Sequence, residues 1–260
     1  MSSRTDLNPA FLLCAVVCIL VLGAASFTRN AVWVSNISLW QDTVAKTPDK
    51  ARPHCNLGGS FTAAGLAGPA ITELRIALEL QPDSAEARYN LGNTLGTIGR
   101  YEEAEQELRA ALRIAPNYLK ARLTLGSIYA SRGRVDDAVR EFEEAKNINP
   151  KDPIAFYNEG ELYGRQGRAD EAIQAYREAL RRGPDFVQAR NNLGALFGKL
   201  GRYEEAAAEF NAVISMRPDD AGAHYNLGML YSKMGRQQES AREFETFQRL
   251  RTEEEKRRLP

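Results

Sequence analysis

The stretch AEARYNLGNTLGTIGRYEEAEQELRAALRIAPNY, residues 85–118, decides the fold of this 260-residue chain. The same pattern recurs without insertion or deletion in six consecutive segments: 51–84, 85–118, 119–152, 153–186, 187–220 and 221–254. Repetition at a fixed period of this length is typical of solenoids, in which each repeat is one supersecondary unit stacked on its neighbours. Positions within a repeat are called places below, and place 1 is the first residue of each segment.

Each repeat contains two amphipathic helical patterns. In residues 85–118 the first apolar stripe consists of Ala87, Leu91, Leu95 and Ile98, and the second of Tyr101, Ala104, Leu108, Ala111 and Leu112. Apolar residues at this spacing share one face of a helix. Gly99 breaks the pattern between the two stripes, and Pro116 ends the second helix. The sequence therefore predicts a helix pair in every repeat.

Small residues recur at three places. Places 8 and 15 hold glycine in all six repeats, and place 20 holds alanine in five and Ser240 in the last. A glycine inside a helix costs about 1 kcal/mol relative to alanine. Its recurrence at place 8 predicts that the second helix of the pair packs closely against the bare backbone there.

These columns resemble the tetratricopeptide repeat (TPR) family, through the Asn-Leu-Gly triplet at 90–92 and the proline at place 32. The resemblance covers residues 51–254. It implies an all-α, right-handed superhelical solenoid whose first helices line a concave, protein-binding groove. One departure is Glu159, which replaces the leucine of the triplet, and we expect looser packing there.

The chain begins differently, with a short tail at 1–8 and an apolar stretch at 9–28. Residues 11–25 read FLLCAVVCILVLGAA, and no charge occurs between Leu7 and Thr28. A helix of about 22 residues rising 1.5 Å per residue would cross a ~30 Å hydrocarbon core. The strongly apolar part is short, and Gly23-Ala24-Ala25 supplies small residues of the kind found at signal-peptide cleavage sites. Residues 9–28 therefore predict either a transmembrane helix or a signal peptide.

A junction with a half-repeat helix follows at 29–50. Ser35, Asn36 or Ser38 can cap this helix, and Ile37, Trp40 and Val44 give it an apolar face. The junction is similar to that of multi-span membrane glycosyltransferase-like proteins with C-terminal TPR domains. This resemblance implies repeats on the extracytoplasmic side, periplasmic or lumenal. At the other end, residues 255–260 are charged and predict a cap that extends the last helix.

Composition and cysteine usage disfavour several function classes. The 34 basic and 34 acidic residues cancel, so the chain lacks the basic excess of a nucleic-acid binder. Its three cysteines make neither a disulfide framework nor a zinc site. His54 and His224 lie five repeats apart and cannot meet in a stack where each repeat touches only its neighbours. We therefore expect no catalytic residues, no metal, no cofactor and no small-molecule substrate.

The candidate binding residues are the asparagines at place 6, since asparagine is not a preferred residue in helix interiors. Place 6 holds Asn56, Asn90, Thr124, Asn158, Asn192 and Asn226 in the six repeats. In TPR proteins this place tends to face the groove, and the O-linked GlcNAc transferase is similar in carrying an asparagine ladder that grips an extended peptide backbone. That resemblance implies the same role here, with Tyr89, Tyr157 and Tyr225 adding contact surface one place earlier. The alternative is that each asparagine bonds a neighbouring helix and only orders the stack.

The sequence thus indicates a membrane-anchored TPR scaffold that binds a protein or extended peptide in its concave groove. Two alternatives stay open: a non-catalytic accessory module of a membrane protein-glycosylation assembly, and a soluble TPR protein secreted after signal cleavage.

We expect the mature protein to retain residues 1–28 and to remain with membranes after alkaline carbonate extraction, because an apolar helix of this length inserts stably. Mass spectrometry of the mature N-terminus checks this. A mature chain that begins at Ser26 would show signal cleavage and make the transmembrane prediction wrong.

Overall fold

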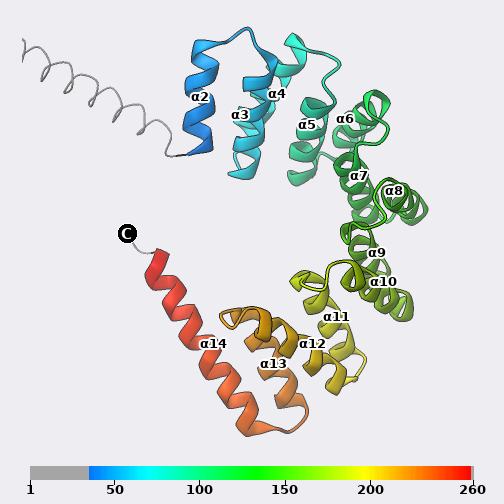
Figure 1. Cartoon of the computed structure of the whole chain (residues 1–260), viewed down its shortest axis with the longest axis vertical. Helices are drawn as coiled ribbons and strands as arrows, with labels where there is room; N and C mark the ends of the chain where they lie inside the picture. Colours follow the sequence, from blue (N-terminus) through cyan, green and yellow to red (C-terminus); the bar gives the residue numbers. More distant parts are fainter. Residues whose placement is uncertain (1–34, 259–260) are drawn as a thin grey trace, which may run out of the picture. The chain divides into compact units, whose positions relative to one another are not determined.

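The computed structural model describes residues 35–258, and every regular element in that range is a helix (Figure 1). The chain divides into two compact units, residues 1–116 and 117–260. The apolar stretch at 9–28 lies outside the described residues, so its assignment stays a prediction. Within 35–258, no helix has both the length and the apolarity needed to cross a membrane.

From residue 35 onward, the first unit consists of a single helix followed by two helix pairs. Its helices are α2 (Asn36–Lys46), α3 (Ala51–Ala63), α4 (Ala67–Leu80), α5 (Ala85–Thr97) and α6 (Tyr101–Ile114). Helix α2 is the one expected in the half-repeat, and it packs on α3. Ser35 is its cap: its hydroxyl accepts from the Ser38 N–H, and the Ser38 hydroxyl accepts in return from the Ser35 N–H. Trp40 is half-buried there.

The second unit consists of four helix pairs in the same register. Its helices are α7 (Leu119–Ser131), α8 (Val135–Ile148), α9 (Ile154–Arg165), α10 (Ala169–Arg182), α11 (Val187–Lys199), α12 (Tyr203–Met216), α13 (Ala221–Lys233) and α14 (Gln237–Arg258). The first helices also contact one another in sequence, α7 with α9, α9 with α11 and α11 with α13. Helix α14 runs on beyond the repeat pattern to Arg258, through the charged residues at the C-terminal end.

A glycine with positive φ ends the first helix of every pair. The six glycines at place 15 have φ between 73° and 77°, a region that other residues rarely adopt. After α5, Gly99 takes this conformation and Arg100 donates its N–H to the Leu95 carbonyl at 2.9 Å, which is the six-to-one bond of a Schellman motif. The helix therefore ends at Thr97. Ile98, expected in the buried stripe, is 44% exposed because the chain has already left the helix.

The glycines at place 8 let the two helices of a pair touch, as their recurrence predicts. A Cβ built on Gly126 would lie 2.5 Å from the Phe142 ring, and one on Gly160 would lie 2.6 Å from the Tyr176 ring. Both rings occupy place 24 of their repeats. At place 20 the five alanines are fully buried, and Ser240 there donates its hydroxyl to the Gly228 carbonyl at 2.9 Å. Each pair is thus held at backbone-contact distance.

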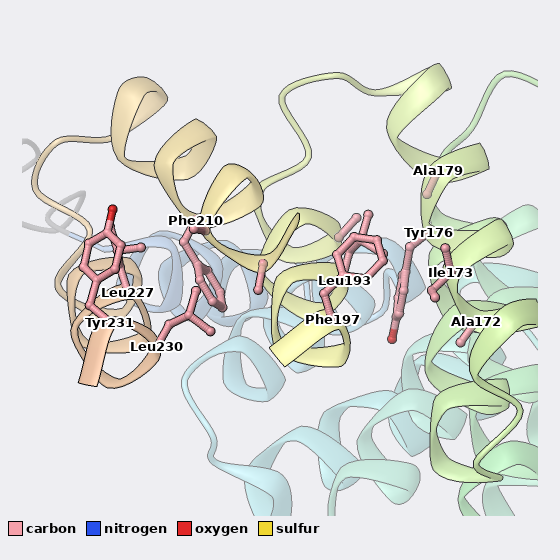
Figure 2. Close-up of a cluster of buried hydrophobic side chains, with 13 residues drawn as sticks. Ala172, Ile173, Tyr176, Ala179, Leu193, Phe197, Phe210, Leu227, Leu230 and Tyr231 are labelled. Carbon is pink, nitrogen blue, oxygen red and sulfur yellow. The ribbon is translucent and has the colours of Figure 1, made fainter. Parts of the chain in front are cut away.

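The apolar core continues from one repeat to the next inside the second unit. Figure 2 shows a row of buried side chains from α10, α11, α12 and α13, among them Tyr176, Phe197, Phe210 and Tyr231. No single pair could bury its stripe alone, so each repeat depends on its neighbours for stability.

A polar side chain at place 4 ties most repeats to the proline before them. Arg88 donates from Nε to the Pro82 carbonyl at 3.2 Å and pairs with Glu107 at 2.8 Å. His54 and His224 do the same, each with one ring nitrogen 2.6 Å from a glutamate and the other 3.1 Å from a proline carbonyl. The two histidines are therefore engaged within their own ends of the stack.

At the junction between the third and fourth repeats, an ion pair occupies two places that are apolar at the other junctions. Glu159, where looser packing was expected, is only 6% exposed and accepts from the Lys146 ammonium at 2.7 Å. Lys146 stands at place 28 of the preceding repeat, where the other residues facing a full repeat are Val44, Leu78, Leu112, Leu180 and Ile214. An apolar contact has thus been exchanged for a buried ion pair. Burial raises the pKa of the Glu159 carboxyl, and the bond from Lys146 offsets part of that effect.

In the fourth repeat a different residue makes the hydrogen bond to the carbonyl of the preceding proline. Phe156 replaces the Arg or His of place 4, and Arg182 donates from Nε to the Pro150 carbonyl at 2.8 Å in its place. The Arg182 guanidinium also lies 3.7 Å from the centre of the Phe156 ring.

We expect Lys146→Leu alone to lower the free energy of unfolding by roughly 3–5 kcal/mol, because it leaves the buried Glu159 carboxylate without its partner. The double variant Lys146→Leu/Glu159→Leu restores the apolar pair and should equal or exceed the wild type. Urea unfolding followed by circular dichroism measures both. A double variant no more stable than Lys146→Leu would contradict the compensation.

Candidate functional site

The place-6 asparagines lie on the first helices of their repeats and are all half-buried. Asn56 is on α3 and Asn90 on α5 in the first unit. In the second unit Asn158 is on α9, Asn192 on α11 and Asn226 on α13.

In the first unit, Asn90 reaches back to the preceding repeat. Its Nδ2 lies 3.4 Å from the Cys55 sulfur, which is buried at place 5. Burial raises the pKa of the Cys55 thiol to about 11, and the bond from Asn90 acts in the opposite direction. The Cys55 sulfur is thus the hydrogen-bond acceptor for Asn90.

In the second unit, one asparagine bonds the place-5 side chain of the preceding repeat in the same way, and another bonds a different residue. Asn192 Nδ2 donates to the Tyr157 hydroxyl at 3.2 Å, again from place 6 to place 5 of the preceding repeat. Asn158 Nδ2 lies 3.4 Å from the Ser127 hydroxyl on α7. Asn90, Asn158 and Asn192 therefore each bond a neighbouring helix, as the stack-ordering alternative expects.

Asn226 does not form the equivalent bond. Its counterpart at place 5 is Asn191, whose Oδ1 is a buried acceptor with no hydrogen-bond partner in the described part of the chain. An unpaired buried acceptor costs about 1–3 kcal/mol. The last junction between first helices therefore leaves unused hydrogen-bonding capacity.

The three candidate tyrosines have different surroundings. Tyr157 is half-buried and its ring centre lies 5.0 Å from that of Phe186. Tyr225 is 43% exposed and its ring centre lies 5.2 Å from that of Phe247 on α14. Tyr89 is half-buried on α5. Tyr225 thus offers the most accessible aromatic surface of the three.

Three adjacent hollows follow the first helices of the second unit. The hollow between α7 and α9 holds about 40 Å³ and is lined by Asn158; the next, between α9 and α11, holds about 260 Å³ and is lined by Asn192. The third, between α11 and α13, holds about 140 Å³ and is lined by Asn226. Neighbouring hollows share Arg165 or Lys199 in their walls. We call this run of hollows the first-helix groove.

Charged residues that sequence reasoning missed also line this groove. Arg165, Lys199 and Lys233 all occupy place 13, the last residue of α9, α11 and α13, and all are exposed. Glu161 is the one acidic residue lining the three hollows. Comparing the repeats column by column would have revealed the place-13 cations, because the earlier repeats have Ala63, Thr97 and Ser131 there.

The groove offers amide donors and acceptors, cations and one carboxylate, which suits it for binding through hydrogen bonds and charge. Within residues 35–258, no group of three or more His, Cys, Asp or Glu side chains is arranged to hold a metal ion.

Two family models, both described as tetratricopeptide repeat, match the chain. One matches residues 60–118, 157–221 and 194–252, and the other matches residues 98–157. A search of curated proteins gives no match.

Solved structures share the fold at low sequence identity. The APC/C hetero-tetramer Cut9-Hcn1 aligns with a TM-score of 0.68 and 17% identity, over 85% of this chain and 43% of that one. PilF of Pseudomonas aeruginosa aligns with a TM-score of 0.65 and 20% identity, over 77% of this chain and 91% of that one. YrrB, described as a TPR protein with an unusual peptide-binding site, gives a TM-score of 0.50 and 22% identity, over 71% and 95%. Identities this low show the fold alone.

We expect iodoacetamide to label Cys55 slowly in the folded protein at pH 8. Raising a thiol pKa from 9.0 to about 11 lowers its thiolate fraction there by roughly a hundredfold, and the thiolate is the reacting form. Peptide mass spectrometry reports labelling at Cys55 separately from Cys14 and Cys18, with the urea-unfolded chain as control. Equal rates in the folded and unfolded states would contradict the burial.

Proposed function

Because the chain belongs to the tetratricopeptide repeat family, we propose that it is a protein-binding scaffold whose first-helix groove holds an extended segment of its partner. The observation that carries this proposal is the row of three adjacent hollows, each lined by one place-6 asparagine. A single residue type repeated along a groove suits a ligand that is itself repetitive, as a peptide main chain is.

The amide chemistry supports the proposal even where the asparagines bond the stack. An asparagine side chain has two N–H donors and an acceptor oxygen. Asn192 donates to the Tyr157 hydroxyl and also interacts with the Tyr176 hydroxyl, which leaves its amide oxygen for a ligand. Asn226 has no hydrogen bond to another side chain in residues 35–258, so its whole amide is available. Ordering the stack and binding a main chain are therefore compatible roles.

The comparisons support the same class of function. YrrB shares the fold and is described as having a peptide-binding site. Partners of the present chain would be read mainly through their backbone, so the groove would accept segments of different sequence.

We propose in addition that residues 9–28 hold the scaffold at a membrane, with the repeats in the periplasm or a lumen. The uncharged apolar run in 9–28 supports an anchor, and the resemblance of the junction to glycosyltransferase-like proteins supports the orientation. The same resemblance favours one alternative, an accessory module of a membrane glycosylation assembly. Cleavage after residue 25 would instead yield a secreted scaffold.

The double variant Asn192→Ala/Asn226→Ala tests the groove. We expect it to weaken binding of peptides selected from a random display library on the full-length chain by at least tenfold. It removes up to four main-chain hydrogen bonds, worth about 0.5–1.5 kcal/mol each. Fluorescence anisotropy with the selected peptides measures the affinity, and thermal melting measures the stability.

Asn147→Ala/Asn211→Ala is the matched control, because both asparagines are exposed on second helices. It should bind like the wild type. If the groove variant melts earlier but binds as well per folded molecule, the asparagines serve only the stack.

A further inference from the structure

The first-helix groove of the second unit carries a row of three cations beside its asparagines. Arg165 lines the hollows on both sides of α9, Lys199 lines those on both sides of α11, and Lys233 lines the last. All three occupy place 13, so they recur at the same height on successive first helices.

These cations differ from the other column of basic residues in the same repeats. At place 16, Arg168, Arg202 and Arg236 each pair with the glutamate three residues later. The place-13 side chains form no ion pair within the described residues, although the same repeats are rich in glutamate. Their charges therefore remain available to a ligand.

Helix stability explains only part of this placement. A cation at a helix C-terminus interacts favourably with the helix dipole, by about 0.3–1 kcal/mol at an exposed site. The first helices α3, α5 and α7 end without one, at Ala63, Thr97 and Ser131, and form equally well. The fold does not require the charge, and the charge recurs in α9, α11 and α13, three of the four first helices that line the groove.

The balance of charge in the groove favours an anionic ligand. Three cations face one carboxylate, Glu161, among the residues that line the three hollows. The chain as a whole is neutral, so this excess is local. Charge complementarity of this kind sets which partners bind and how fast they associate.

We propose that the groove selects an acidic extended peptide, whose carboxylates meet Arg165, Lys199 and Lys233 while its main chain meets the asparagines. This rests on the proposed function, since it names the side chains of the segment bound there. Packed helices lie about 8–10 Å apart, and a segment extended as polyproline II rises about 3.1 Å per residue with three residues per turn, so every third side chain lies on one face. The preferred ligand therefore has an acidic residue at roughly every third position.

The test compares two fluorescein-labelled peptides on the purified full-length chain. One is four copies of Asp-Ser-Gly, and the other has Asn in place of each Asp. We expect the acidic peptide to bind at least tenfold more tightly at low salt, and this preference to shrink as sodium chloride is raised from 50 to 500 mM.

The variant Arg165→Gln/Lys199→Gln/Lys233→Gln should bring the two affinities within about twofold of each other. A matched control, Arg113→Gln/Lys151→Gln/Arg217→Gln, removes the same charge from exposed residues outside the first helices and should keep the preference. Equal loss in both variants would mean that net charge alone attracts the peptide, and the proposal would be overturned.

The outcomes also separate this inference from the proposed function. If both peptides bind equally and Asn192→Ala/Asn226→Ala weakens both, the groove binds main chain and the acidic preference is wrong. If neither peptide binds at millimolar concentration while library-selected peptides do bind, the acidic preference is again wrong. If no peptide of any kind binds, both proposals fail.

Discussion

The missing side chain at place 8 sets the distance between the two helices of every repeat, and the rest of the stack depends on that distance. A large residue at place 24 lies directly against the glycine backbone, at positions where an added Cβ would come within 2.5–3.2 Å of it. At five of the six glycines the contact is under 3.0 Å and the obstructed ring or isobutyl group is itself buried among neighbours, so it has little room to move. The glycine therefore fixes the pair geometry, and the pair geometry fixes which residues of the first helix remain on its outer side.

That outer side serves both the stack and the groove. Asn192 bonds tyrosine hydroxyls of the preceding repeat, and its side chain lines a hollow where the amide oxygen is left for a ligand. A residue that is positioned by one bond keeps its other groups in a fixed direction, which lowers the conformational entropy lost when a ligand binds. The stack-ordering bonds of the asparagines thus support their proposed role in binding.

Much of the helix architecture could be read from residues 85–118 alone, because each column has one local physical cause. Glycine at places 8 and 15, alanine at place 20 and proline at place 32 each act within a single repeat. Ile98 was misassigned because hydrophobic periodicity continues one residue past the point where Gly99 turns the chain. The Lys146–Glu159 pair was missed for a different reason. Glu159 stood out as a departure at place 7, but its partner lies across a repeat boundary, so the pair is visible only when place 28 of one repeat is compared with place 7 of the next.

The candidate site was less predictable than the fold. The asparagine column was visible, but its bonds to Cys55, Ser127 and Tyr157 depend on contacts between repeats that sequence spacing does not give. The place-13 cations were also visible as a column. What the sequence could not show is that no glutamate of the same repeats reaches them.

The buried pair between Lys146 and Glu159 has a consequence for how the array assembles. Repeats with the same period and nearly the same core can stack on the wrong neighbour during folding, because most of their contacts are interchangeable. Helix α9 follows α8 without penalty, whereas the second helices α4, α6, α10 and α12 would each present an aliphatic residue to the Glu159 carboxylate. One charged contact in the middle of the chain thus specifies the junction between the third and fourth repeats of an otherwise repetitive sequence.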